Sequence, residues 1–284
     1  MFGFINVDKP KGMTSHDVVA ILRRITKIKQ IGHTGTLDPF ATGVLPICIG
    51  KATRLIEYLD DDKAYLATIQ FGMNTDTYDV DGSVVERFDK KITNSELEEV
   101  LGQFRGDIEQ YPPIYSAIKV NGKKLYEYAR KGEEVEIKPR KVCVSELTLK
   151  EFDFETQIAK VYVKCSAGTY IRSIAFDIGK LLGCGAHLIG LVRTQAGRFV
   201  IENAVMLEGL SVEKVNNSLI NPLEVLNYLK IEVQDSDLFN IKNGVALSNL
   251  SVPNNEVVLL TYKNNICAVG FSEDNKISLK KVFL

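Results

Sequence analysis

Several signatures of common protein classes are missing from this chain of 284 residues. Its five cysteines are scattered without a Cys-x-x-Cys pair and its three histidines show no ligand spacing, so neither a disulfide framework nor a metal site is predicted. The sequence has no run of about 18 apolar residues and its start does not read as a signal peptide, which favours a reducing cytoplasm and no membrane span. A P-loop and a Gly-x-Gly-x-x-Gly fingerprint are also absent, so no nucleotide or redox cofactor is expected.

Length and composition predict a globular protein with a large core. Hydrophobic residues make up 45% and charged residues 25%, which are ordinary proportions for a globular chain. The length suits one large domain followed by a small one.

Positive charge is concentrated in three segments, although the net charge is only −1. Residues 1–54 contain 8 Lys/Arg against 3 Asp/Glu, residues 110–150 contain 9 against 5, and residues 156–200 contain 6 against 1. The three segments together carry +14, so the remainder carries −15. A phosphate backbone contacts local patches, so this distribution fits an RNA partner if the segments fold into one face. Three separately solvated surfaces are the alternative.

Periodic apolar residues predict three helices. The first follows Thr14 and has a basic outer face, and the second follows a capping box formed by Thr93 and Glu96. The third covers residues 171–182 and ends at Gly183, a residue type that commonly terminates helices.

Alternating and β-branched residues predict strands over 65–71, 142–149 and 158–165. Because helices and strands do not alternate regularly, an α+β domain is indicated. Beyond about residue 230, short apolar segments separated by polar turns predict a small β-rich domain with strands over 256–262, 266–271 and 277–284.

The segment Gly32–Gly43, GHTGTLDPFATG, is the strongest candidate for a functional loop. Its three glycines and one proline predict a rigid loop, and it contains a single carboxylate, Asp38, close to His33. Asp38 is either the reactive group of a site or the start of an Asx turn, since Asp before Pro commonly initiates a turn. His33 could act as a base or offer a flat ring to a nucleotide.

Two residues elsewhere in the chain could complete a site around this acid. An ionised and oriented carboxylate usually has an arginine partner, and Arg172 in the segment GTYIR is a candidate. It could equally be a surface arginine of a helix. Tyr65 either packs in the core through its strand or stacks on a base with its hydroxyl near the reacting atoms.

Five blocks of the sequence resemble, in order, the motifs of the bacterial tRNA pseudouridine-55 synthases, the TruB family of pseudouridine synthases. Together they span most of residues 3–200, and five motifs in family order are highly specific. The blocks are KPKGMTSHDVV (9–19), GHTGTLDPFATGVLPICIGKATR (32–54), KAYLATIQFGMNTDTYDVDG (63–82), YPPIYSAIKVNGKKLYEYARKG (111–132) and GTYIRSIAFDIGKLLGCGAHLIGLVRTQAG (168–197).

The resemblance implies a role for each matched position. Asp38 would be the catalytic residue, Arg172 its salt-bridge partner, and Tyr65 the residue that stacks on the target base. Lys9 and Pro10 would serve structure near the site. The residues that would line the uridine site are His33, Tyr65, Tyr170 and Leu191.

The resemblance also implies how RNA is held. Residues 116–141, with eight Lys/Arg, match a mobile insertion that clamps the T stem-loop of tRNA. Asp81 falls in a stretch that contacts RNA in the family. The RNA-contact candidates are Asp81, Lys119, Lys123, Lys124 and Arg130.

The fold implied by the resemblance is a pseudouridine-synthase domain over residues 1–228, with a central mixed, mainly antiparallel sheet flanked by helices. A small β-rich, PUA-like RNA-binding domain is expected over residues 229–284. No exposed heptad or apolar helix face stands out, so a monomer is expected.

The implied activity is the isomerisation of uridine to pseudouridine at position 55 of the tRNA T loop, on a flipped-out base and without cofactor or metal. A tRNA-binding or tRNA-folding protein in which catalysis is secondary is an alternative. A pseudouridine synthase that depends on a guide RNA is another.

Overall fold

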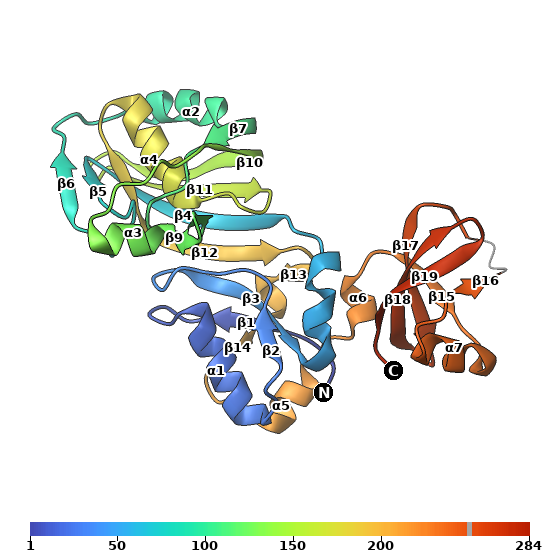
Figure 1. The fold of residues 1–284 in the computed structure, drawn as a ribbon. Helices are drawn as coiled ribbons and strands as arrows, with labels where there is room; N and C mark the ends of the chain where they lie inside the picture. The colour runs from blue at the N-terminus through green and yellow to red at the C-terminus, as the bar shows by residue number, and fades with distance from the viewer. Residues whose placement is uncertain (249–251) are drawn as a thin grey trace.

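A sheet of ten strands runs through the larger part of the molecule, as Figure 1 shows for a computed structural model that describes residues 1–248 and 252–284. The strands of this sheet are β1 (Gly3–Lys9), β2 (Ile31–His33), β3 (Thr42–Ile49), β4 (Lys63–Phe71), β7 (Gly106–Gln110), β10 (Arg140–Asp153), β11 (Ile158–Cys165), β12 (Ala186–Ala196), β13 (Phe199–Val200) and β14 (Val205–Met206).

The strand order is β14-β1-β3-β12-β4-β11-β10-β7, with β2 added to β3 and β13 added to β12. The pairs β1–β14 and β3–β12 are parallel and the other pairs are antiparallel, so the predicted mixed, mainly antiparallel sheet is confirmed. Because β12 lies between β3 and β4, it joins the N-terminal strands to the rest of the sheet.

The predicted helices begin and end where local signals place them. Thr14 and Asp17 form a capping box at the start of the first helix, and Thr93 and Glu96 form another at the second. Gly183 terminates the third helix in the left-handed conformation, with φ 67°. The helices of this part are α1 (Ser15–Thr26), α2 (Asn94–Gln103), α3 (Leu125–Lys131), α4 (Ile171–Leu182), α5 (Val212–Asn217) and α6 (Pro222–Val225), with 3-10 helices η1 (Gly50–Tyr58) and η2 (Ile201–Asn203).

Two short hairpins project from the large sheet. One consists of β5 (Met73–Thr75) and β6 (Val84–Arg87), and the other of β8 (Lys119–Val120) and β9 (Lys123–Lys124). The second hairpin and α3 belong to the basic segment 116–141.

Apolar side chains of the sheet and of α4 form the main core. Val161 of β11, Ile69 of β4 and Ile174 of α4 are all at most 2% exposed. Complete burial of such side chains contributes about 1.5–3 kcal/mol each, so the packing of α4 on the sheet is well determined. That packing matters because α4 also carries Arg172.

A second sheet of five strands forms the C-terminal part, coloured orange to red in Figure 1. Its order is β15-β17-β18-β19-β16, beside the short helix α7 (Leu238–Lys242) and the 3-10 helix η3 (Asp235–Asp237). The strands are β15 (Leu229–Glu232), β16 (Leu247–Ser248), β17 (Glu256–Tyr262), β18 (Asn265–Glu273) and β19 (Lys276–Val282).

An apolar cluster joins the two sheets. Phe4 and Leu55 of the larger part belong to the same buried cluster as Val269 and Phe283 of the smaller part. At its edge the Lys51 amine donates to the carbonyl of Phe283 at 2.9 Å. The C-terminal part is thus packed against β1, β3 and η1.

No helix among the described residues has the length and apolar character needed to cross a lipid bilayer.

Candidate active site

The loop over residues 34–41, between β2 and β3, presents Asp38 and is fastened to the start of α1. Ser15 Oγ accepts from the Leu37 amide at 2.8 Å and donates to the Leu37 carbonyl at 3.2 Å. The Gly12 amide donates to the Pro39 carbonyl at 2.8 Å. The residues on both sides of Asp38 are therefore held by backbone contacts, which limits where its carboxylate can point.

Lys9 contacts the same loop through its buried side chain. Its side chain is fully buried, and Nζ donates to the carbonyls of Pro10 at 2.9 Å, Met13 at 2.7 Å and Pro39 at 3.4 Å. Burial lowers the pKa of Lys9 to about 8, while the nearby Asp38 carboxylate opposes that change. A buried ammonium with three carbonyl acceptors fits the structural role predicted for this position.

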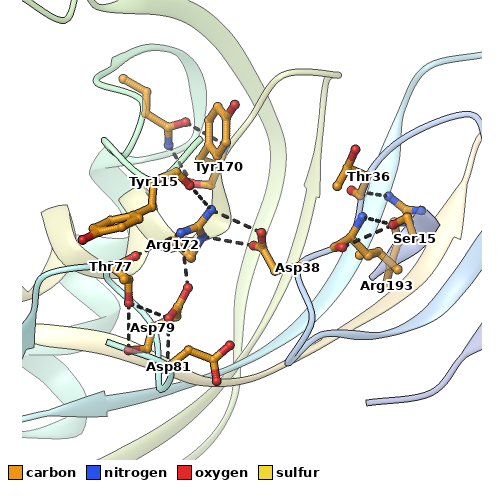
Figure 2. A network of polar contacts seen from close by, with 12 residues as sticks. Ser15, Thr36, Asp38, Thr77, Asp79, Asp81, Tyr115, Tyr170, Arg172 and Arg193 are labelled. Atoms are coloured by element: carbon orange, nitrogen blue, oxygen red, sulfur yellow. Dashed lines mark hydrogen bonds and ion pairs between the residues drawn. The ribbon is translucent and has the colours of Figure 1, made fainter. Parts of the chain in front are cut away.

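Arg193 of β12 holds the other end of the loop. Its side chain is 1% exposed, and its guanidinium donates to the carbonyls of Val44 at 2.6 Å, Gly35 at 3.2 Å and Thr36 at 3.4 Å. Gly43 makes this approach possible, since a Cβ atom there would lie 2.3 Å from the Arg193 carbonyl and its φ is 99°. Figure 2 shows Ser15, Thr36 and Arg193 converging on this side of the loop.

The Asp38 carboxylate faces the Arg172 guanidinium, which projects from the first turn of α4 (Figure 2). Arg172 Nε lies 3.0 Å from Asp38 Oδ2, and Nη2 donates to Asp38 Oδ1 at 3.3 Å. The Arg172 side chain is 6% exposed and that of Asp38 is 33% exposed, so the carboxylate opens toward solvent from a buried partner. A paired guanidinium of this kind orients a carboxylate through two of its nitrogens.

Arg172 has a second carboxylate partner. Its Nη1 lies 3.2 Å from Asp79 Oδ2 and donates to the Thr77 carbonyl at 3.1 Å, and its Nη2 also donates to the Tyr115 carbonyl at 3.0 Å. Asp79 is almost fully buried. One cation therefore serves two carboxylates, and only Asp38 has an open side.

Opposing effects set the charge on Asp38. Burial raises its pKa and the Arg172 guanidinium lowers it, while the carboxylates of Asp79 and Asp81 raise it further. The net direction is upward, so Asp38 is a more basic carboxylate than an exposed aspartate.

Asp38 lies in a cleft of about 560 Å³. Among the described residues that line this cleft it is the one carboxylate, which makes it the acidic group available to a ligand. The lining residues are Thr14, Gly35, Thr36, Leu37, Asp38, Pro39, Lys63, Tyr65, Tyr115, Ser116, Ala117, Tyr126, Gly168, Thr169, Tyr170, Ile171, Arg172 and Leu191.

Three of the predicted substrate-binding residues line this cleft. Tyr65 of β4 and Leu191 of β12 are each 7% exposed. Burial raises the pKa of Tyr65 to about 12, so its hydroxyl keeps its proton at neutral pH. Tyr170 precedes α4, and its amide and carbonyl both bond to the Gln110 side chain, at 2.8 and 3.0 Å. The cleft thus offers apolar and aromatic walls around one acid.

Two other predicted residues lie apart from the lining of this cleft. His33 ends β2, opposite Ile47 in β3, and is half-buried. Asp81 is exposed in the turn after Asp79, and its amide donates to Asp79 Oδ1 at 3.1 Å. Their roles toward a nucleotide or RNA stay predictions.

The basic segment 116–141 borders the cleft through Ser116, Ala117 and Tyr126. The amine of Lys124 and the guanidinium of Arg130 each lie 5.3 Å from the centre of the Tyr126 ring. Lys119, Lys123 and Arg130 are exposed and Lys124 is half-buried. Lys124 and Arg130 therefore lie beside a residue that lines the cleft, and Lys119 and Lys123 lie on the same hairpin as Lys124.

Sequence reasoning missed Asp79 and Arg193. An isolated arginine inside the apolar segment LIGLVRTQA is a signal that could have identified Arg193, because a buried guanidinium needs specific acceptors. For Asp79, the sequence shows two acids in the segment DVDG and does not show which of them reaches Arg172.

No group of three or more His, Cys, Asp or Glu side chains in residues 1–248 and 252–284 is arranged to hold a metal ion.

Sequence comparisons place two family domains along this chain. Residues 23–171 match the TruB family pseudouridylate synthase (N terminal domain), and residues 172–226 match the tRNA pseudouridylate synthase B C-terminal domain. A tRNA pseudouridine synthase B from Caldanaerobacter subterraneus is 46% identical over 99% of both chains. Another from Clostridium kluyveri is 39% identical over the full length of both.

A solved structure has the same fold. The chain is similar to one in the crystal structure of a Cbf5-Nop10-Gar1 complex, with a TM-score of 0.73 and 27% identity, over 100% of this chain and 85% of the other.

Proposed function

The chain belongs to the TruB family of pseudouridylate synthases, and on that basis we propose that it isomerises uridine 55 in the tRNA T loop with Asp38 as its catalytic residue. As a tRNA pseudouridine synthase it is an isomerase. The position in the RNA and the roles of individual side chains belong to the proposal.

One observation carries the assignment of Asp38. Among the described cleft residues it is the one acid, and the buried guanidinium of Arg172 orients it at 3.0 Å. Asp79 contacts the same guanidinium but is almost fully buried and does not line the cleft. Asp38 is therefore the carboxylate that a bound nucleoside would meet.

The reaction moves atoms within one nucleoside. The bond between uracil N1 and C1′ breaks, the base turns in the cleft, and C5 bonds to C1′; C5 then loses its proton and N1 gains one. An ionised Asp38 can supply the negative charge that such a rearrangement needs, either as a nucleophile or as a base. Its raised pKa makes it a better proton acceptor than an ordinary aspartate.

The walls of the cleft suit a base that has been flipped out of the base stack of the RNA. Tyr65 offers an aromatic face and Leu191 an apolar one, and Tyr170, the residue before α4, also lines the cleft. Extruding a nucleotide costs a few kcal/mol, and stacking of about 1–3 kcal/mol per base offsets much of that cost. We assign Tyr65 the stacking role, and His33 the place that the flipped nucleotide leaves.

The basic segment 116–141 would clamp the T stem-loop. Lys119, Lys123 and Arg130 are exposed on the segment that contributes Tyr126 to the cleft, where phosphates of a docked stem would lie. Lys124 packs beside Tyr126 and would act at closer range. We place the catalytic domain at residues 1–228 and an RNA-binding domain at 229–284, where β15 begins.

A guide-dependent synthase is the second candidate, because a similar solved chain, 25% identical with a TM-score of 0.72, comes from an "H/ACA RNP bound to a substrate RNA", an assembly of protein with RNA. Full-length relatives at 39–46% identity favour the tRNA enzyme instead. Activity of the purified chain alone on T-arm RNA separates the two.

The decisive experiment is pseudouridine mapping on unmodified T-arm RNA with the purified protein. Wild type should convert uridine 55, and Asp38→Asn should lower the single-turnover rate by about 10³-fold or more while the RNA dissociation constant stays within about twofold. Asp107→Asn, at an exposed strand position, is the matched control. Equal product from wild type and Asp38→Asn would refute the assignment; a role confined to tRNA folding predicts that equality.

A further inference from the structure

Tyr78 stands between the two turn residues that contact Arg172. Thr77 offers its carbonyl to Arg172 Nη1 at 3.1 Å, and Asp79 offers its carboxylate to the same nitrogen at 3.2 Å. Any shift of the turn at Tyr78 therefore moves both acceptors at once. Tyr78 itself does not line the cleft.

The Tyr78 ring stacks on Phe176 of α4. The ring centroids are 4.0 Å apart and the planes are 18° from parallel. Phe176 lies four residues after Arg172, so the two side chains share one face of the helix. The turn is thus fastened to α4 at two points one helical turn apart, by polar contacts at Arg172 and by an aromatic pair at Phe176.

The backbone at Tyr78 adopts an unusual conformation. Its φ of 63° lies in the left-handed region, where a bulky side chain is disfavoured and persists only if its surroundings hold it. Two backbone contacts do so: Tyr78 N donates to the Thr75 carbonyl at 3.2 Å, and Leu188 N donates to the Tyr78 carbonyl at 3.0 Å. The stacking of the Tyr78 ring on Phe176 restrains the side chain of Tyr78 as well.

We propose that Tyr78 is a positioning residue, whose stack on Phe176 holds the Thr77 carbonyl and the Asp79 carboxylate where they aim the Arg172 guanidinium at Asp38. This inference rests on the proposed catalytic role of Asp38. The aromatic pair of Tyr78 and Phe176, outside the cleft, would keep the Arg172 guanidinium in contact with both carboxylates.

The consequence is a defect of the chemical step rather than of RNA binding. If the turn loosens, Asp79 can draw Arg172 away from Asp38, and Asp38 loses the neighbour that favours its charged form. The rate falls and the acid limb of the pH–rate profile moves to higher pH. RNA affinity stays unchanged, because Tyr78 and Phe176 lie outside the cleft lining.

Four variants test this on T-arm RNA under single-turnover conditions. Tyr78→Asn removes the ring but suits the left-handed backbone, so backbone strain does not explain its effect. We expect it to slow the chemical step by about three- to tenfold, the range of an aromatic pair, with an unchanged dissociation constant. Phe176→Leu should match it, the double variant should add no further loss, and Tyr78→Phe should retain the wild-type rate and pH profile.

Phe154→Asn is the control, because Phe154 is an exposed aromatic residue of the turn between β10 and β11. Thermal melting identifies any variant that fails to fold, and Phe176→Leu then tests the stack from its other side. A wild-type rate and pH limb in both Tyr78→Asn and Phe176→Leu would overturn the proposal, as would a loss confined to RNA affinity. Failure of the proposed function looks different: the wild type would then form no pseudouridine, or Asp38→Asn would remain active.

Discussion

Ser15 and Leu37 exchange two hydrogen bonds across a sequence separation of 22 residues. The serine hydroxyl accepts from the leucine amide and donates to the leucine carbonyl, and it satisfies both backbone groups in a buried setting. Through this pair the start of α1 fixes the residue that precedes Asp38. The N-terminal block of the sequence therefore acts on the site without entering the chemistry.

Removal of this hydroxyl should disturb stability and catalysis together. Ser15→Ala leaves the buried amide and carbonyl of Leu37 without their partner, which costs about 1–3 kcal/mol. We expect a lower urea midpoint and a slower single-turnover rate, with little change in RNA affinity. Ser145→Ala, which removes an exposed hydroxyl bonded to the Lys164 carbonyl, is the matched control. Equal effects of the two substitutions would contradict the proposed anchoring role.

Asp79→Asn should shift the pH dependence of the reaction. The Asp79 carboxylate raises the pKa of Asp38, so its neutralisation lowers that pKa and moves the acid limb of the single-turnover rate to lower pH. The plateau rate should fall as well, because Arg172 loses an orienting contact. Single-turnover rates measured from about pH 4.5 to 8, the range in which carboxylates of raised pKa and histidines titrate, test this predicted shift of the acid limb. A limb displaced to higher pH would argue against this electrostatic account.

Asp177 of α4 should make folding stability depend on pH. Burial raises the pKa of Asp177 to about 6, against an ordinary 3.8, and the Lys180 amine only partly opposes this. A carboxyl whose pKa is raised by folding stabilises the protein below its unfolded pKa, and that stability is lost as pH rises through the folded value. Asp177→Asn should therefore match wild type near pH 4 and exceed it in urea unfolding at pH 8. Asp89→Asn, at an exposed position, should have the stability of wild type at both pH values.

The exposed lysines of the basic segment should contribute to the salt dependence of RNA binding. If Lys119 and Lys123 contact phosphates, replacing each by alanine lowers the slope of log K against log salt concentration by about 1. Titrations of T-arm RNA at several salt concentrations measure that slope. Lys160→Ala is the matched control. Lys123 lies 3.5 Å from a Glu133 oxygen and Lys160 lies 2.7 Å from a Glu151 oxygen, so both are ion-paired lysines. Because Lys160 lies in β11, outside the basic segment, its replacement should leave the slope unchanged. An unaltered slope in the double variant would remove these lysines from the interface.

Local signals in the sequence predicted most of the individual elements. The capping box of Thr93 and Glu96 marks the start of α2, and Gly183 marks the end of α4, because both act within one helical turn. The segment Gly32–Gly43 is only partly a loop, since β2 includes Gly32 and His33 and β3 begins at Thr42. Short strands at the ends of a loop depend on pairing partners that the local sequence does not show.

The arrangement of the site required the structure. The family resemblance predicted that Arg172 pairs with Asp38. It did not predict that Asp79 rather than Asp81 is the second partner of Arg172, because that depends on the conformation of the turn at Tyr78. Arg193 reaches the loop because β3 and β12 run parallel, with Arg193 beside Gly43. Such contacts join residues about 100 or more positions apart, and no local pattern reports them.

The place of β12 also sets an order in which the molecule can assemble. Asp38 lies on the loop between the N-terminal strands β2 and β3, and Arg172 lies on α4, which packs against β4 and β12. In the sheet, β12 is the strand inserted between β3 and β4. During synthesis residues 186–196 leave the ribosome after both neighbours, so the halves cannot be joined in the sheet until about two-thirds of the chain has emerged. Strands that lie far apart in the sequence pair slowly, because closing the long loop between them costs conformational entropy before their contacts form. The cleft is thus complete only after residues 186–196 have been synthesised, because β12 supplies both Leu191 of its lining and Arg193, which holds the Asp38 loop.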